Sequence, residues 1–109
     1  MKKGEIWLLD FPSRGGHEQR GTRPALLIAN TGTDLMIVIP LTSNLQALRF
    51  PHTLEVKKSD ANGLDEDSIA MLFQMQALDK RRFLTCIGEL EHSVMKKIDD
   101  ALLLLLQLQ

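Results

Sequence analysis

The sequence is poor in cysteine and in long apolar runs, and each shortage excludes a class of protein. A single cysteine among 109 residues cannot form an internal disulfide, which indicates a reducing compartment such as the cytoplasm. The longest apolar run, Ala101–Leu106, is far shorter than the roughly 20 residues of a membrane-spanning helix. Glu5 and Asp10 interrupt the apolar stretch near the N-terminus, which argues against a signal peptide. We therefore expect no membrane partner.

The chain also has no excess of charge of one sign. Its 13 Lys and Arg against 14 Asp and Glu give a formal net charge of −1, which argues against binding nucleic acid by bulk electrostatics. The charges are unevenly distributed, because residues 1–25 hold five basic and three acidic side chains, and the rest holds eight and eleven. A binding site for a polyanion must therefore be local and close to the N-terminus.

What the sequence does contain is a series of short apolar segments that are typical of β-strands. Within Glu5–Phe11, the alternation places Trp7, Leu9 and Phe11 on one face of a strand. The polar, glycine-rich stretch Pro12–Thr22 reads as a loop, and its length suggests a functional one. Further strands are predicted over Ala25–Asn30, Leu35–Ile39, Thr53–Val56, Ser68–Gln76 and Thr85–Leu90, with turns at Thr31–Asp34 and Asn62–Gly63.

The C-terminal segment has the spacing of a helix rather than of a strand. Val94, Ile98, Ala101, Leu102 and Leu105 recur at helical intervals, with charged residues between them. The whole chain, residues 1–109, is thus predicted to be one domain of mainly β structure with a C-terminal helix, an α+β fold built on a small barrel. The consecutive leucines at the end of the helix make all of its faces apolar there. We therefore expect this end to be buried, either deep in the core of the protomer or in the interface of a homodimer.

The stretch from residue 14 to residue 23 is the strongest candidate for a site. Three arginines occur here together with a histidine, a glutamate and a glutamine, namely Arg14, Arg20, Arg23, His17, Glu18 and Gln19. Guanidinium groups bind phosphate through a planar fork of donors, and a histidine exchanges protons near neutral pH. The alternative is a solvated loop whose charges have no function.

Other kinds of site are not supported. Gly15-Gly16 fits neither a Walker A loop nor a dinucleotide fingerprint. The three histidines are far apart in the chain, without the spacing of a metal motif. Cys86 is expected to be a small buried core residue. No metal or other cofactor is implied.

Six short motifs occur in a fixed order along the chain. They are Gly4-Glu5-Ile6-Trp7, Gly16-His17-Glu18-Gln19, Gly21-Thr22-Arg23-Pro24, Pro40-Leu41-Thr42-Ser43, Asp67-Ser68 and Gln76-Ala77-Leu78-Asp79. In this order the chain resembles the MazF/PemK (Kid) family of toxin endoribonucleases from Gly4 to about Leu106. The resemblance implies an SH3-like barrel, a homodimer, metal-independent cleavage of single-stranded RNA (mRNA), and inhibition by a cognate antitoxin protein.

The resemblance also implies roles for individual residues. Arg23 and Thr42 match the catalytic arginine and threonine of the family, and His17 is the first candidate for the general base or acid, followed by Glu18. An equally good explanation of Glu18 is a structural role, in which its side chain stabilises the loop through hydrogen bonds to the backbone. The expected RNA-binding residues are Arg14, Gln19, Arg20, Ser43, Asn44, Gln76, Lys80, Arg81 and Arg82.

Some positions depart from the family pattern. Met71 and Phe73 stand where some relatives have an arginine and an acid, and Gln76 stands near the place of another arginine. Phe73 could stack a base, although a core role is the expected one. Two alternatives to a ribonuclease stay open. One is a toxin like CcdB, which shares the barrel architecture and binds DNA gyrase without hydrolysing anything. The other, motivated by Met71 and Phe73, is a catalytically weak relative that binds RNA or an antitoxin.

Overall fold

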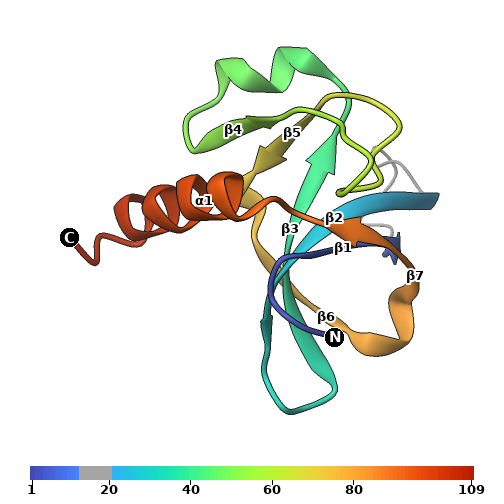
Figure 1. The fold of residues 1–109 in the computed structure, drawn as a ribbon. Coiled ribbons are helices and arrows are strands. Elements are labelled where there is room, and N and C mark those ends of the chain that lie inside the picture. The colour runs from blue at the N-terminus through green and yellow to red at the C-terminus, as the bar shows by residue number, and fades with distance from the viewer. Residues whose placement is uncertain (13–20) are drawn as a thin grey trace.

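The computed structural model describes residues 1–12 and 21–109. The elements of this part of the chain are strands β1 (Glu5–Phe11), β2 (Gly21–Asn30), β3 (Leu35–Thr42), β4 (Thr53–Val56), β5 (Ser68–Met71), β6 (Gln76–Asp79) and β7 (Phe83–Glu89), the 3₁₀ helices η1 (Leu45–Arg49), η2 (Leu72–Gln74) and η3 (Lys80–Arg82), and helix α1 (His92–Leu105). The predicted class, a mainly β fold with one C-terminal helix, is confirmed (Figure 1).

All of the pairings are antiparallel, and the strand order is β4-β5-β3-β2-β1-β7, with β6 also paired to β3. Strand β3 changes partner along its length. Leu35–Val38 pair with β6, whereas Leu41 and Thr42 pair with β5. The sheet therefore changes partners at the middle of β3, and Val56 of β4 and Ala70 of β5 share one apolar core with Ile6 of β1 and Leu26 of β2.

Apolar side chains are buried on both faces of the sheet. On β1, Ile6 belongs to the cluster under α1, which also contains Ile98 and Leu102 of the helix. Leu9 and Phe11 belong to a second cluster on the other face, with Trp7 packed against it. The predicted common face of Trp7, Leu9 and Phe11 is thus confirmed. Burial of an aliphatic side chain stabilises the fold by about 2 kcal/mol, so the two helix residues anchor α1 firmly.

Several predicted boundaries were wrong. The last strand, predicted over Thr85–Leu90, spans Phe83–Glu89. Gly21 and Thr22 belong to β2 rather than to the loop, because they continue its ladder with β1 up to the pair Phe11–Gly21. Strand β3 runs on through Pro40 to Thr42, since its end pairs with β5. The single strand predicted over Ser68–Gln76 is broken by η2, where the Leu72 amide donates to the His52 carbonyl oxygen.

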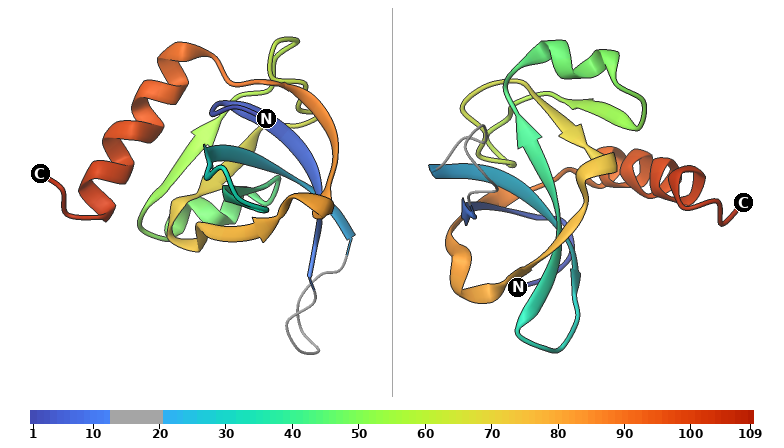
Figure 2. Two further views of the ribbon diagram at one scale, coloured as in Figure 1. Left: turned by 90° about the horizontal axis from the view of Figure 1, so that it is seen from below. Right: turned by 180° about the vertical axis from the view of Figure 1, so that it is seen from behind.

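Three side-chain environments also differ from the prediction. Phe73 lies in η2 and is 42% exposed, so it is not a core residue. Cys86 is exposed on β7. At the end of α1, Leu104 and Leu106 are exposed, which excludes a place deep in the core of the protomer. Figure 2 shows this end of the helix extending beyond the sheet.

The described residues contain no helix that is both long and apolar enough to cross a membrane.

Candidate functional site

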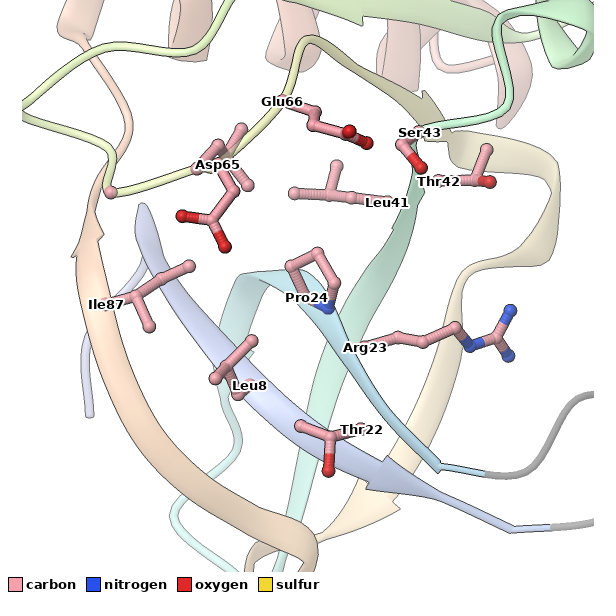
Figure 3. A pocket seen from close by; sticks show the side chains of 12 residues that line it. Leu8, Thr22, Arg23, Pro24, Leu41, Thr42, Ser43, Asp65, Glu66 and Ile87 are labelled. Carbon is pink, nitrogen blue, oxygen red and sulfur yellow. The ribbon is translucent and has the colours of Figure 1, made fainter.

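An open cleft of about 640 Å³ lies where strands β1, β2 and β3 face a loop and strand β7 (Figure 3). The strands and the segment after β3 contribute Leu8, Thr22, Arg23, Pro24, Leu41, Thr42 and Ser43. The opposite side consists of Gly63, Leu64, Asp65, Glu66 and Ile87. The cleft thus brings together residues that are up to 79 positions apart in the sequence.

Arg23 lies on β2 at the strand edge of the cleft, where its backbone pairs with Leu9 of β1. Its guanidinium carbon is 5.0 Å from the centre of the Phe11 ring, a cation–π distance. The Arg23 Nε is buried and has no hydrogen-bond partner among the described residues. Since an unsatisfied buried donor is costly, an anion bound beside this group would satisfy it.

Thr42 is the last residue of β3 and pairs with Ile69 of β5. Its hydroxyl oxygen accepts a hydrogen bond from the Asn44 amide at 3.2 Å, and its hydroxyl proton can be donated to a ligand. The Asn44 side chain caps η1 by accepting from the Gln46 amide at 3.1 Å. Thr42 therefore offers a donor to the cleft, while Asn44 holds the segment behind it.

The opposite wall carries two carboxylates that the sequence reasoning missed. Asp65 and Glu66 are exposed and line the cleft, and Figure 3 shows Asp65 across the cleft from Arg23. The neighbouring Asp67 is engaged elsewhere, because it accepts from the Lys58 amide at 2.9 Å and lies 3.6 Å from Lys57 Nζ. These contacts, the backbone hydrogen bond above all, lower the pKa of Asp67. The cleft thus has one basic and one acidic side.

The acidic run from residue 65 to residue 67 is visible in the sequence, but nothing there places it opposite Arg23. Its position results from the contact of residues 57–64 with β7, which is distant in the chain. The nearest sequence signal is the turn Asn62–Gly63, which the structure confirms.

The basic residues of η3 lie outside the residues that line the cleft. Each is paired with an acidic side chain: Lys80 with Asp34 at 3.3 Å, Arg81 with Asp79 at 3.1 Å and Arg82 with Asp10 at 3.9 Å. The Arg81 side chain, through its hydrogen bond, lowers the pKa of Asp79. Gln76 on β6 is also outside the cleft, and its side-chain amide donates to the Gln74 carbonyl oxygen at 3.2 Å.

Of the residues predicted for the site, the structure therefore brings Arg23, Thr42 and Ser43 to one cleft, with Asn44 adjacent. The predicted residues Arg14, His17, Glu18, Gln19 and Arg20 lie outside the described residues. In the ranges 1–12 and 21–109 no three His, Cys, Asp or Glu side chains are grouped as metal ligands would be.

Comparisons with known proteins identify the family of the chain. A family model described as PemK-like, MazF-like toxin of type II toxin-antitoxin system matches residues 2–106. The chain is 33% identical to "Endoribonuclease MazF" of Staphylococcus saprophyticus, over 94% of this chain and 88% of that protein. It is 31% identical to "Endoribonuclease EndoA" of Bacillus subtilis, over 94% of this chain and 90% of that protein.

Solved structures give the same result for the fold. Crystal form I of MazF from Deinococcus radiodurans matches with a TM-score of 0.77 and 28% identity, over 98% of this chain and 96% of that one. A MazE-MazF crystal structure from the same organism matches with a TM-score of 0.76 and 28% identity, over 100% of this chain and 97% of that one.

Proposed function

Because the chain belongs to the family of PemK-like, MazF-like toxins of type II toxin–antitoxin systems, we propose that it is an endoribonuclease that cleaves single-stranded RNA in the cytoplasm. The observation that best supports this activity is the position of Arg23, whose buried Nε lacks a partner among the described residues and whose side chain shares a cleft with Thr42. Both curated relatives are named as endoribonucleases.

In the proposed reaction, the ribose 2′-oxygen attacks the adjacent phosphorus atom while the bond from phosphorus to the 5′-oxygen breaks. A general base takes the proton of the 2′-hydroxyl, and a general acid gives a proton to the leaving 5′-oxygen. The products are a 2′,3′-cyclic phosphate and a 5′-hydroxyl end, and no metal or other cofactor is needed. His17 is our first candidate for the general base or the general acid, and Glu18 is the second candidate.

In this proposal Arg23 stabilises negative charge and does not transfer a proton. A guanidinium is a poor proton donor, but its forked N–H groups suit the negative charge that grows on the phosphoryl oxygens. The Thr42 hydroxyl donates to the same phosphate. Because both side chains come from paired strands, they are held in place before RNA binds.

The decisive experiment incubates the purified protein with single-stranded RNA of varied sequence in the presence of EDTA. We expect cleavage that leaves 5′-hydroxyl ends, and a rate that falls about 10² to 10³-fold in Arg23→Ala, the usual effect of losing one charge-stabilising donor. Lys96→Ala is the control, because it removes a positive charge on α1 that is paired with Asp100 at 3.3 Å and lies outside the cleft. Equal activity of Arg23→Ala and the wild-type protein would contradict the proposal.

The two alternatives have distinct outcomes. Inhibition of gyrase supercoiling without RNA cleavage would indicate the CcdB-like activity, which none of the reported relatives supports by name. RNA binding with negligible turnover would indicate a weak relative, an outcome motivated by Met71 and Phe73. Phe73 is exposed and lies 5.8 Å from Phe50 between ring centres, so it is free to contact RNA.

We also propose that the protein is a homodimer and that a cognate antitoxin binds it. The exposed leucines at the end of α1 support a dimer because they leave apolar surface uncovered in the protomer. The match to a MazE-MazF structure supports an antitoxin partner. Sedimentation at micromolar concentration tests the dimer, and a monomer there would contradict it. The other expected RNA contacts are Ser43, Asn44, Arg14, Gln19, Arg20, Gln76, Lys80, Arg81 and Arg82.

A further inference from the structure

Ser59, Asn62 and Glu91 form a polar network that the proposed reaction does not use. Asn62 is fully buried, and its side-chain oxygen accepts from the amides of Ser59 and Leu64, each at 3.0 Å. Its side-chain nitrogen donates to the Lys57 carbonyl oxygen at 2.9 Å. These bonds fold residues 57–64 into a tight loop around one asparagine.

Glu91 ties this loop to the start of α1. One carboxylate oxygen accepts from the Ser59 hydroxyl at 2.6 Å, and the other accepts from the Asn62 side-chain nitrogen at 3.2 Å. Glu91 occupies the N-cap position of α1 but makes no side-chain cap bond there. Its carboxylate is therefore directed to the loop instead of to its own helix.

The loop and β7 also touch through their backbones. The Glu89 amide donates to the Ala61 carbonyl oxygen at 2.9 Å. A β-carbon at Gly63 would overlap the Ile87 carbonyl oxygen, and one at Gly88 would overlap the Asn62 backbone. This close approach leaves no room for the loop to be displaced toward β7. Away from β7, the loop is held by the Glu89–Ala61 hydrogen bond and by the Glu91 carboxylate.

The chain passes from this network directly into the cleft. Gly63, Leu64, Asp65 and Glu66 form the wall that faces the strand side. We propose that Glu91 is a positioning residue for RNA cleavage, because its carboxylate, through Ser59 and Asn62, holds this wall at its distance from the strands. This role rests on the proposed endoribonuclease activity.

The expected effect follows from the separation between the wall and the reacting groups. Arg23 and Thr42 stand on strands that Glu91 does not touch, so the chemical step retains its charge stabilisation when the wall loosens. RNA is then held less closely, which raises KM more than it lowers kcat. A residue that only stabilises the fold would lower the fraction of active protein without changing KM.

The experiment compares Glu91→Ala with Glu89→Ala in steady-state cleavage of one RNA substrate. Glu89 is a matched control because it is two residues away and its carboxylate lies 3.9 Å from Lys2, on the surface. We expect KM to rise about tenfold in Glu91→Ala, with kcat within about threefold of the wild type. The KM of Glu91→Gln, which keeps one acceptor oxygen, should lie between that of Glu91→Ala and that of the wild type. The KM of Glu89→Ala should match that of the wild type.

A second readout does not depend on cleavage. Hydrogen exchange of the amides of residues 64–66 should accelerate in Glu91→Ala but not in Glu89→Ala, since only the former frees the loop. Ile98→Val, a change in the buried face of α1, supplies a destabilised protein with the network intact. Its KM should equal that of the wild type.

The outcomes separate the two proposals. An unchanged KM in Glu91→Ala, or an equal rise in Ile98→Val at the same loss of Tm, would overturn the positioning role even if the exchange of residues 64–66 accelerates. No cleavage by the wild-type protein would overturn the proposed function itself, and with it the reaction that Glu91 serves. Cleavage by the wild type with the KM pattern above would support both.

Discussion

The two sides of the cleft are built in different ways. On the strand side, the positions of Arg23 and Thr42 follow from backbone ladders, through the pairs Arg23–Leu9 and Thr42–Ile69. On the loop side, residues 63–66 belong to no strand. Their position depends largely on side chains: those of Ser59, Asn62 and Glu91, and that of Ser68, whose hydroxyl donates to the Glu66 carbonyl oxygen at 3.0 Å.

Because of this difference, the residues that position the cleft can be distinguished from the residues that face it. On the strand side a functional side chain can be replaced without loosening its backbone, because the ladder does not use side chains. On the loop side the residues that hold the wall, such as Asn62, differ from those that face the cleft, such as Asp65. Substitutions on the strand side should therefore lower the rate of the chemical step with little loss of stability, whereas substitutions on the loop side should lower stability and weaken RNA binding.

The largest effect is expected from Gly63→Ala on the loop side. The new β-carbon would overlap the Ile87 carbonyl oxygen, and the backbone at Gly63 has a φ of +71°, which side chains rarely adopt. We expect a loss of about 3 kcal/mol or more in the free energy of unfolding, measured by urea denaturation. Gly32→Ala is the control, because Gly32 has a φ of +77° with no atom within 4 Å of the new carbon. Equal losses in the two variants would show that the contact with β7 is unimportant.

Asn62→Ala should have the next largest effect. It leaves the buried Leu64 amide and the partly buried Ser59 amide without their acceptor, so we expect a loss of about 2 to 3 kcal/mol in the free energy of unfolding. Asn30→Ala removes two side-chain bonds of the same kind, to the Gly32 amide and the Met1 carbonyl oxygen, from an exposed turn. It should cost less than about 1 kcal/mol, and a similar cost in both variants would refute the special role of the loop.

Thr42→Val tests the strand side. It removes the hydroxyl but keeps the shape of the side chain, so we expect the cleavage rate to fall about tenfold or more with Tm changed by only a few degrees. Thr42→Ser keeps the hydroxyl and should retain most of the activity. If Thr42→Val cleaves RNA as fast as Thr42→Ser, the hydroxyl does not donate to the phosphate.

The smallest effect concerns pH. Hydrogen bonds, first that from the Ser59 hydroxyl, lower the pKa of Glu91 in the folded protein. A lowered pKa favours folding while the carboxylate is ionised, so the contribution is complete above the ordinary glutamate pKa of about 4.3 and is lost as the pH falls through the lowered value. Below that ordinary value, the Tm of the wild type should therefore converge on that of Glu91→Gln. Parallel curves for the two proteins would show that this ionisation does not contribute to stability.

Much of the fold could be predicted because it depends on local patterns. The strands Glu5–Phe11 and Thr53–Val56 have the predicted bounds, and the spacing of Ile98 and Leu102 predicted the buried face of α1. The break at Leu72–Gln74 could not be predicted, because no glycine or proline marks it. It results from the change of partner along β3, which is a property of the assembled sheet.

The candidate site likewise contains residues that could be predicted from the sequence and residues that could not. Arg23 and Thr42 were recognised from short motifs, and the structure places both on one cleft. Asp65 and Glu66 were missed because their position depends on contacts such as that of Asn62 with Glu91, 29 residues further along the chain. Cys86 was wrongly expected in the core, because apolar character alone does not identify the outward face of an edge strand.

The pairing of β1 with β7 has a consequence for synthesis of the protein. It joins Glu5 to Glu89 and Leu9 to Phe83, so β1 must wait for β7 to be synthesised before its outer edge is covered. Contacts of such long sequence separation slow folding. Because Ile87 and Glu91 follow the other residues of the cleft in the chain, a nascent polypeptide lacks part of the cleft until the ribosome has passed residue 91. The order of translation thus delays formation of the cleft until β7 and the start of α1 are available.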